Sequence, residues 1–272
     1  MRNVAYINRP NRPLHLYALV YLAFLYVPVL FLPLFSFNDS TYIAFPFKGF
    51  TTAWYEQMLD NKPMQAALMN SIRVASIAAL VATMFGILGA KAVTRYRIRG
   101  QKPVVGAIML PLVIPGIIMG VALLILVNKL GVPLSLYTIT LGHILISIPF
   151  SMATLMARFE GFDKSMEEAA ADLGDNAWWA FWRVTFPMVF PGVLASLLLC
   201  FTISFDEFIM AFFLAGTEST LPIFIYTQLR FPQKLPGVLA LGACILMVSF
   251  VVVFFAQWLR RRGIAGSSNA GV

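Results

Sequence analysis

The sequence contains few of the residues on which enzyme sites and disulfide-rich domains depend. Only 12% of its 272 residues are charged, and it has two histidines and two cysteines, whereas an average soluble domain is about one quarter charged. Cys200 and Cys244 both lie in apolar runs, so they suit buried packing positions better than a disulfide framework or a metal site. Serine, histidine and carboxylate residues form no recognisable catalytic motif. The sequence therefore predicts neither a catalytic site nor a metal site.

A nucleotide-binding loop is also missing. No stretch has the form G-x-x-x-x-G-K-[ST], and the nearest, Gly86 to Val93, lacks the Gly-Lys-Ser/Thr ending and lies in an apolar run. We expect no cofactor in this chain. If ATP drives the protein, a separate subunit must bind ATP and its magnesium.

Apolar residues are abundant instead, at 60% of the chain with a mean hydropathy of +0.80. They form runs of about twenty residues, which is long enough to cross a bilayer core. The predicted fold class is an all-α polytopic membrane protein with a 16–259 transmembrane domain between a 1–15 arm and a 260–272 tail. A soluble all-α protein is the alternative, but most runs lack the polar face it would need. The six predicted spans are residues 16–35, 67–93, 104–127, 136–156, 190–214 and 238–259.

Several residues inside the predicted spans suggest how the helices bend and pack. Pro111 and Pro115 predict a bend in the third span, and Gly116 and Gly120 predict a close helix contact there. His143 in the fourth span is interpreted as a helix–helix hydrogen-bonding residue, with contact to a substrate as the alternative.

The net charge of +8 is interpreted as a signature of membrane orientation. Fourteen of the 20 lysines and arginines lie on the side of the two termini, against five on the other side (Lys48, Lys62, Lys129, Arg230 and Lys234). Because cytoplasmic loops are enriched in these residues, we predict that both termini lie in the cytoplasm. A nucleic-acid partner is not expected.

The longest predicted cytoplasmic loop, about residues 158–188, has a clear helix pattern. Asp163 or Ser165 can cap a helix, two glutamates fall in its first turn, and Gly174 suits its end. Three alanines, residues 169–171, leave its surface open to close approach. A second, aromatic helix containing Trp178 is expected along the membrane interface, with residues 186–187 turning the chain into the fifth span. The alternative is a helix pair that only shields the loop backbone.

The loop also resembles a known motif. Glu168-Ala169-Ala170, three residues, Gly174, nine residues, Val184, one residue, Phe186-Pro187 is similar to the EAA loop of type I ABC importer permeases, which reads EAA, three residues, G, nine residues, I, one residue, LP. Only the two apolar positions Val184 and Phe186 differ. Six spans with this loop between the fourth and fifth also resemble that family.

The resemblance implies a multi-pass permease of the bacterial inner membrane, without enzymatic activity, that forms a solute pathway. Its implied partners are two ATP-binding subunits, a second related permease in a heterodimer, an external substrate-binding protein and membrane lipid. In the family the loop forms a coupling helix that docks on the ATPase subunit. The implied docking residues are Glu167, Glu168, Ala169, Ala170, Asp172, Leu173 and Gly174.

Asp206 and Glu207 are candidate pathway residues. Charges within a span are costly and therefore informative, and this pair lies toward the predicted outer face, where it can attract a cation. On a continuous helix only one of two adjacent side chains would face the pathway; the alternative is a structural pair. The surrounding stretch resembles permeases of the spermidine/putrescine branch, which implies a polyamine or another small polar solute.

Two other classes of protein remain as alternatives. A secondary transporter or a channel for a small cation predicts inverted repeats and ionisable residues at mid-membrane, and neither is evident in the sequence. A membrane enzyme would need a catalytic cluster.

Overall fold

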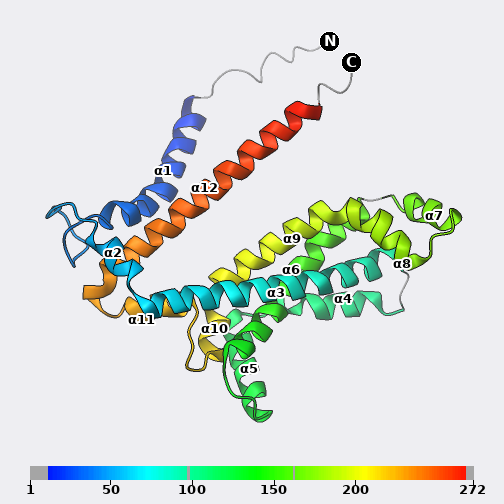
Figure 1. Ribbon diagram of the computed structural model, residues 1–272, viewed down its shortest axis with the longest axis horizontal. Helices are drawn as coiled ribbons and strands as arrows, with labels where there is room; N and C mark the ends of the chain where they lie inside the picture. The colour runs from blue at the N-terminus through cyan, green and yellow to red at the C-terminus, as the bar shows by residue number, and fades with distance from the viewer. Residues whose placement is uncertain (1–11, 97–98, 162, 268–272) are drawn as a thin grey trace. The chain divides into compact units, whose positions relative to one another are not determined.

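The structure is a computed structural model that describes residues 12–96, 99–161 and 163–267 (Figure 1). In these ranges the regular elements are helices, and strand pairing is limited to one bridge between Asn38 and Phe50. The elements in chain order are α1 (Arg12–Phe35), α2 (Ala53–Leu59), α3 (Lys62–Arg95), α4 (Gln101–Met109), η2 (Leu110–Leu112), α5 (Gly116–Lys129), α6 (Leu136–Glu160), α7 (Ser165–Asp172), α8 (Ala177–Ala180), η3 (Phe181–Thr185), α9 (Phe186–Asp206), α10 (Ile209–Leu214), α11 (Leu221–Gln228), η4 (Pro232–Lys234) and α12 (Leu235–Ser267).

The helices confirm the predicted all-α membrane class. Within the part of the chain that the structure describes, five helical stretches are long and apolar enough to cross a membrane, and a bent pair makes up to six. The five are residues 13–35, 62–95, 136–160, 177–206 and 232–251. The bent pair consists of residues 101–112 and 116–129.

The chain divides into two compact units, of which the first contains residues up to 62 and from 227 onward. Its long helix α12 packs against α1 and α2. The loop between α1 and α2 is fixed by polar contacts: the Trp54 indole donates a hydrogen bond to the Asn38 carbonyl at 2.9 Å, and Ser36 and Tyr55 share one at 2.6 Å. The rings of Phe35 and Phe47 stack nearby.

The second unit, residues 63–226, has the antiparallel helices α6 and α9 at its centre. Small residues on α3 let that helix approach them closely. A Cβ on Gly86 would lie 2.8 Å from the Ser151 Cβ, which is closer than real Cβ atoms come. Helices in membranes depend on such small residues because lipid supplies no hydrophobic drive for them to associate. The contact that the sequence predicts for Gly120 is confirmed, since a Cβ there would lie 2.7 Å from the Phe213 ring on α10.

A row of hydrogen bonds, which we call the α6–α9 polar ladder, joins these two helices at every fourth residue. His143 Nδ1 lies 2.7 Å from Ser204 Oγ, which confirms the predicted helix–helix role of His143. The Cys200 thiol donates to the Ser147 carbonyl at 3.6 Å, and Ser196 donates to Ser151 at 2.8 Å. Residues four apart share one face of a helix, so the ladder fixes the axial register of α6 against α9.

The third predicted span is not a continuous helix. The two halves meet at an angle of 101° at residues 113–115. The predicted bend is in fact an interruption of the helix. Pro115 lies immediately before α5, and its ψ of 133 is outside the helical region. A proline has no N–H to donate and disfavours helical geometry in the residue before it, which explains why the helix breaks at this point.

The fifth span begins and ends earlier than predicted. It runs continuously from Ala177 to Asp206, so residues 177–185 are its first turns rather than a separate interfacial helix. The predicted turn at Pro187 is therefore wrong. A π-helical segment, residues 181–185, precedes this proline, and Phe186 N–H donates to Phe181 O, five residues back. This wider turn accommodates a residue that cannot make the usual helical bond.

The first and last helices are longer than the first and last spans predicted from the sequence. Helix α1 starts at Arg12, inside the predicted arm, and α12 continues to Ser267, inside the predicted tail. Arginine is a good helix former, so the residues 260–262 extend the helix rather than end it. The remainder of the predicted arm, residues 1–11, and of the tail, residues 268–272, lies outside the described residues.

Candidate functional site

Helix α7, the centre of the predicted coupling loop, has well-defined ends. At its start the Asp163 carboxylate accepts a hydrogen bond from Ser165 N–H at 3.0 Å. The Ser165 N–H and hydroxyl lower the pKa of the Asp163 carboxyl. At its end Gly174 has φ +95, a left-handed conformation. The N–H groups of Gly174 and Asp175 donate to the carbonyls of Ala171 and Ala170, both at 3.0 Å, which is the Schellman pattern for ending a helix.

The seven predicted docking residues divide between two faces of α7. Ala170 is buried and Glu167 is half-buried, so both face the body of the protein. The other five are exposed, and Leu173, at the end of the helix, is 90% exposed. The outward set is Glu168, Ala169, Asp172, Leu173 and Gly174.

The Glu167 carboxylate joins three helical segments. Its Oε1 lies 3.4 Å from Arg95 Nε, at the end of α3. The same oxygen accepts a hydrogen bond from the Thr185 hydroxyl at 2.8 Å, and Thr185 belongs to η3 at the start of the fifth span. The side chains of Arg95 and Glu167 are only 8% and 18% exposed. We call Glu167, Arg95 and Thr185 the Glu167 junction.

Two cations at the end of α3 also contact aromatic rings. The Arg95 guanidinium carbon lies 6.0 Å from the centre of the Phe159 ring, on α6. Lys91 Nζ lies 4.4 Å from the centre of the Phe181 ring, on η3. Such cation–π contacts are worth about 0.5–1 kcal/mol at exposed sites and more where water is excluded. Through these contacts the end of α3 is fixed to the helices on both sides of α7.

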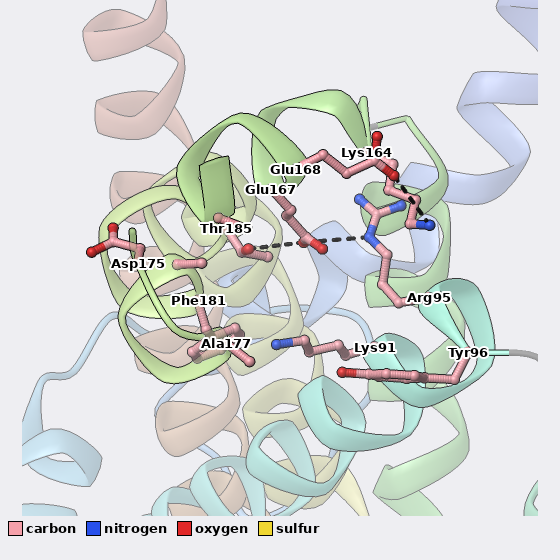
Figure 2. Close-up of a pocket in the computed structure, with 12 residues that line it drawn as sticks. Lys91, Arg95, Tyr96, Lys164, Glu167, Glu168, Asp175, Ala177, Phe181 and Thr185 are labelled. Carbon is pink, nitrogen blue, oxygen red and sulfur yellow. Dashed lines mark hydrogen bonds and ion pairs between the residues drawn. The ribbon is translucent and has the colours of Figure 1, made fainter. Parts of the chain in front are cut away.

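A cavity of about 450 Å³ lies between α7, α8 and the end of α3. In Figure 2 the side chains of Lys91 and Arg95 enter it from α3 and that of Glu167 from α7, and dashed lines join Glu167 to Arg95 and to Thr185. Three cationic and three acidic side chains line the cavity (Lys91, Arg95, Lys164, Glu167, Glu168 and Asp175). The balanced charge does not favour an anion or a cation, and among the described residues no group could hold a metal ion.

The start of the fifth span is anchored beside α7. The Asn176 side chain caps it by accepting hydrogen bonds from the backbone N–H groups of Trp178 and Trp179 at 3.1 and 3.0 Å. Arg183 forms an ion pair with Asp175 at 2.8 Å and lies over the Trp179 ring at 4.9 Å. The exposed indole rings suit a membrane–water interface.

Asp206 and Glu207 occupy the break between α9 and α10 rather than one helix. Asp206 is the last residue of α9 and is exposed. Glu207 has an extended backbone, with ψ 113, and its carboxylate accepts a hydrogen bond from Met210 N–H at 3.0 Å, so it caps α10. Of the two candidate pathway residues, Glu207 therefore holds the start of α10, whereas Asp206 is exposed.

Sequence reasoning did not find the partners of Glu167. Arg95 lies 72 residues before it, and Thr185 lies 18 residues after it. The signal in the sequence is Arg95, a charged residue near the end of an apolar run, and the charge bias of membrane orientation explains such a residue equally well. A long-range pair of this kind becomes visible only when α3 and the loop are placed side by side.

Comparison with known proteins identifies the family. Residues 82–263 match the family described as binding-protein-dependent transport system inner membrane component. The chain is 34% identical, over 91% of its length and 93% of the relative, to the spermidine/putrescine transport system permease protein PotC of Escherichia coli strain K12. It is 33% identical to the putrescine transport system permease protein PotI of the same strain, over 96% and 95% of the two chains.

A solved structure supports the fold. The chain superposes with a TM-score of 0.69 on a bacterial ABC transporter involved in the import of the acidic polysaccharide alginate, at 19% identity and over 94% of this chain and 98% of the other. This likeness concerns the fold alone. The family match implies an ATPase and a substrate-binding protein as partners. The chain belongs to the inner-membrane permeases of binding-protein-dependent ABC importers, which are multi-pass, non-catalytic components that work with a separate ATPase subunit.

Proposed function

We propose that this permease forms half of the translocation pathway of a polyamine importer, with spermidine and putrescine as its solutes. The observation that carries the proposal is the 34% identity, over nearly the full length, to a permease named for spermidine and putrescine transport. The exposed carboxylate of Asp206 supports it, because an acidic group at the mouth of a pathway attracts a polyamine cation.

The second part of the proposal concerns α7, which we assign as the coupling helix. Its exposed face has small and acidic residues with Leu173 extending from the end, and its ends are fixed by a cap and a Schellman turn. Such a surface suits insertion into a groove of an ATPase subunit. We assign the docking contacts to the five outward residues and exclude Ala170, which is buried, and Glu167, which is half-buried and faces the body of the protein.

The orientation follows from charge. We propose that both termini and α7 lie in the cytoplasm, where ATP is available, and the excess of lysine and arginine on one side supports this. The chain would pair with a second, related permease, each contacting one of two ATPase subunits, and a soluble protein would deliver the solute from outside. ATP and its magnesium would bind to the ATPase subunits alone. ATP binding would draw the two coupling helices together and open the pathway outward.

Reconstitution tests this function. The permease pair, the ATPase subunits and the binding protein are placed in vesicles, and uptake of radiolabelled spermidine and putrescine is measured with and without ATP. The expected result is uptake that needs ATP, the binding protein and the ATPase subunits together. Uptake that proceeds without the ATPase subunits would instead make the chain a secondary transporter or channel. ATP-dependent uptake of a neutral or anionic solute, without uptake of polyamines, would refute the assigned substrate.

A further inference from the structure

We propose that Glu167 is a positioning residue that transmits movement of α7 to α3 and to the fifth span, rather than a residue that contacts the ATPase. The inference rests on the function proposed above, because it assumes that α7 receives force from an ATPase subunit. It assigns a role to the Glu167 junction, whose residues are not part of the proposed docking surface.

The geometry of the junction suits force transmission. Glu167 Oε1 contacts Arg95 Nε at 3.4 Å and accepts a hydrogen bond from Thr185 at 2.8 Å. Thr185 is 1% exposed, and the Arg95 side chain is 8% exposed. Both partners of Glu167 are thus held in a packed environment, although the Glu167 carboxylate also lines the cavity, and charge-assisted hydrogen bonds are the stronger kind. A displacement of α7 must move both partners or break both contacts.

The neighbouring glutamate provides a contrast within the same helix. Glu168 forms an ion pair with Lys164 at 3.4 Å, but both side chains are more than half exposed, at 65% and 60%. Lys164 immediately precedes α7 in the chain, so this pair joins no second helix. An exposed pair of this type contributes little to stability. Glu168 is thus placed for an external partner, and Glu167 for internal connection.

The junction also reaches α6 through Arg95, whose guanidinium lies over the Phe159 ring at 6.0 Å. Phe159 is fully buried and packs with Val189 of α9. The helices on either side of α7 are themselves held by the α6–α9 polar ladder. Movement of α7 through Glu167 would therefore shift α3, α6 and α9 together instead of deforming the loop.

The first experiment compares coupling with assembly in the reconstituted importer. For Glu167→Gln we expect normal binding of the ATPase subunits but roughly tenfold fewer solute molecules transported per ATP hydrolysed, within the range typical of coupling between sites. Glu168→Gln should instead weaken ATPase binding and leave the transport ratio unchanged. Glu160→Gln, at the exposed end of α6, is the matched control without effect.

Two further variants separate transmission from simple misfolding. The exchanged pair E167R/R95E restores an ion pair and leaves a donor for the Thr185 hydroxyl, but it loses the contact of Arg95 with the Phe159 ring, so it should recover part of the transport ratio. Thr185→Val keeps the shape of the side chain and removes its hydrogen bond to Glu167, so it should lower the ratio by a smaller factor than Glu167→Gln does, because Glu167 keeps its contact with Arg95.

The second experiment needs neither an ATPase nor a solute, so it distinguishes failure of this inference from failure of the proposed function. Spin labels replace the exposed Leu173, beyond α7, and the exposed Leu88 on α3, in a C200S/C244S background. The label-to-label distances should form one narrow distribution, which E167Q broadens and E160Q leaves unchanged. An unchanged distribution in E167Q, or an unchanged transport ratio, overturns the inference. Reduced ATPase binding by E167Q at a normal transport ratio also overturns it.

Discussion

Gly174 offers the most direct test of α7 as a docking element, because the cost of replacing it comes from the backbone alone. Its φ of +95 lies in a region that residues with a side chain rarely adopt, and a Cβ there would meet no atom within 4 Å. Alanine at this position therefore adds strain without a clash within the chain. We take this strain to be about 1–2 kcal/mol, which corresponds to a roughly 5- to 30-fold smaller population of the native helix end.

The expected result for Gly174→Ala is that ATPase binding and uptake fall by a similar factor while the amount of permease in the membrane is unchanged. Both quantities can be measured in one preparation by titrating the ATPase subunit and by following uptake of labelled spermidine. Gly161→Ala is the matched control, because Gly161 also ends a helix but has φ −76, which any residue adopts, and its nearest Cβ contact would be an ordinary 3.6 Å.

A series of substitutions at Gly174 separates strain from contact with the partner. Asparagine tolerates positive φ better than alanine, although it is larger, and valine tolerates it least. If strain controls docking, function should decrease in the order Gly, Asn, Ala, Val. If the partner's surface presses on this position, Asn should be worse than Ala. Wild-type binding and uptake in the valine variant would refute the assignment of α7 as the coupling helix.

Three other expectations concern the membrane region. Asp206→Asn should raise the KM for spermidine uptake about two- to fivefold, the effect of one exposed charge. Glu218→Gln, which neutralises an exposed carboxylate in a loop, should leave the KM unchanged. Equal KM values for the two variants would indicate that Asp206 has a structural role. Gly86→Ala should lower the free energy of unfolding in detergent by about 1–3 kcal/mol, since its Cβ would overlap Ser151. Gly106→Ala should not lower it, because a Cβ at Gly106 would meet no atom within 4 Å. Equal Tm values for the two variants would argue against the close approach of α3 to α6. Ser204→Ala removes the partner of His143 Nδ1 and should lower the free energy of unfolding by about 0.6 kcal/mol, the average for such bonds in membranes. The expected sign is a lower Tm without a change in the KM for uptake. An unaltered Tm would show that this bond does not hold the two helices together.

The features that sequence predicts well are those that depend on local chemistry. Apolar length identified the spans, and the left-handed end of α7 at Gly174 follows from the one residue type that adopts it without strain. The cap at Asp163 can be predicted for the same reason, because its carboxylate accepts a hydrogen bond from Ser165 N–H only two residues away. His143 was interpreted correctly because a polar side chain in a membrane needs a partner, whichever helix supplies it.

The features that sequence missed depend on how the backbone responds to proline and on distant contacts. The helix is broken before Pro115 but continues through Pro187, because a π-helical turn accommodates the second proline. Nothing in the local sequence distinguishes the two prolines. Apolar content does not mark the break at Glu207 either, since hydrophobic residues continue on both sides. The Glu167 junction joins residues up to 72 positions apart and is set by packing.

The α6–α9 polar ladder bears on how the chain enters the membrane. Alone in lipid, α6 would expose the ring of His143 and the hydroxyl of Ser151 to a medium that cannot hydrogen-bond them. Once α9 has been synthesised, His143 and Ser151 gain partners on it. Insertion of α6 and α9 as one hairpin, with the short α7 left behind at the surface, avoids that exposure. On this route, the helix assigned to receive the work of an ATPase would also be the bend around which two membrane helices enter the bilayer together.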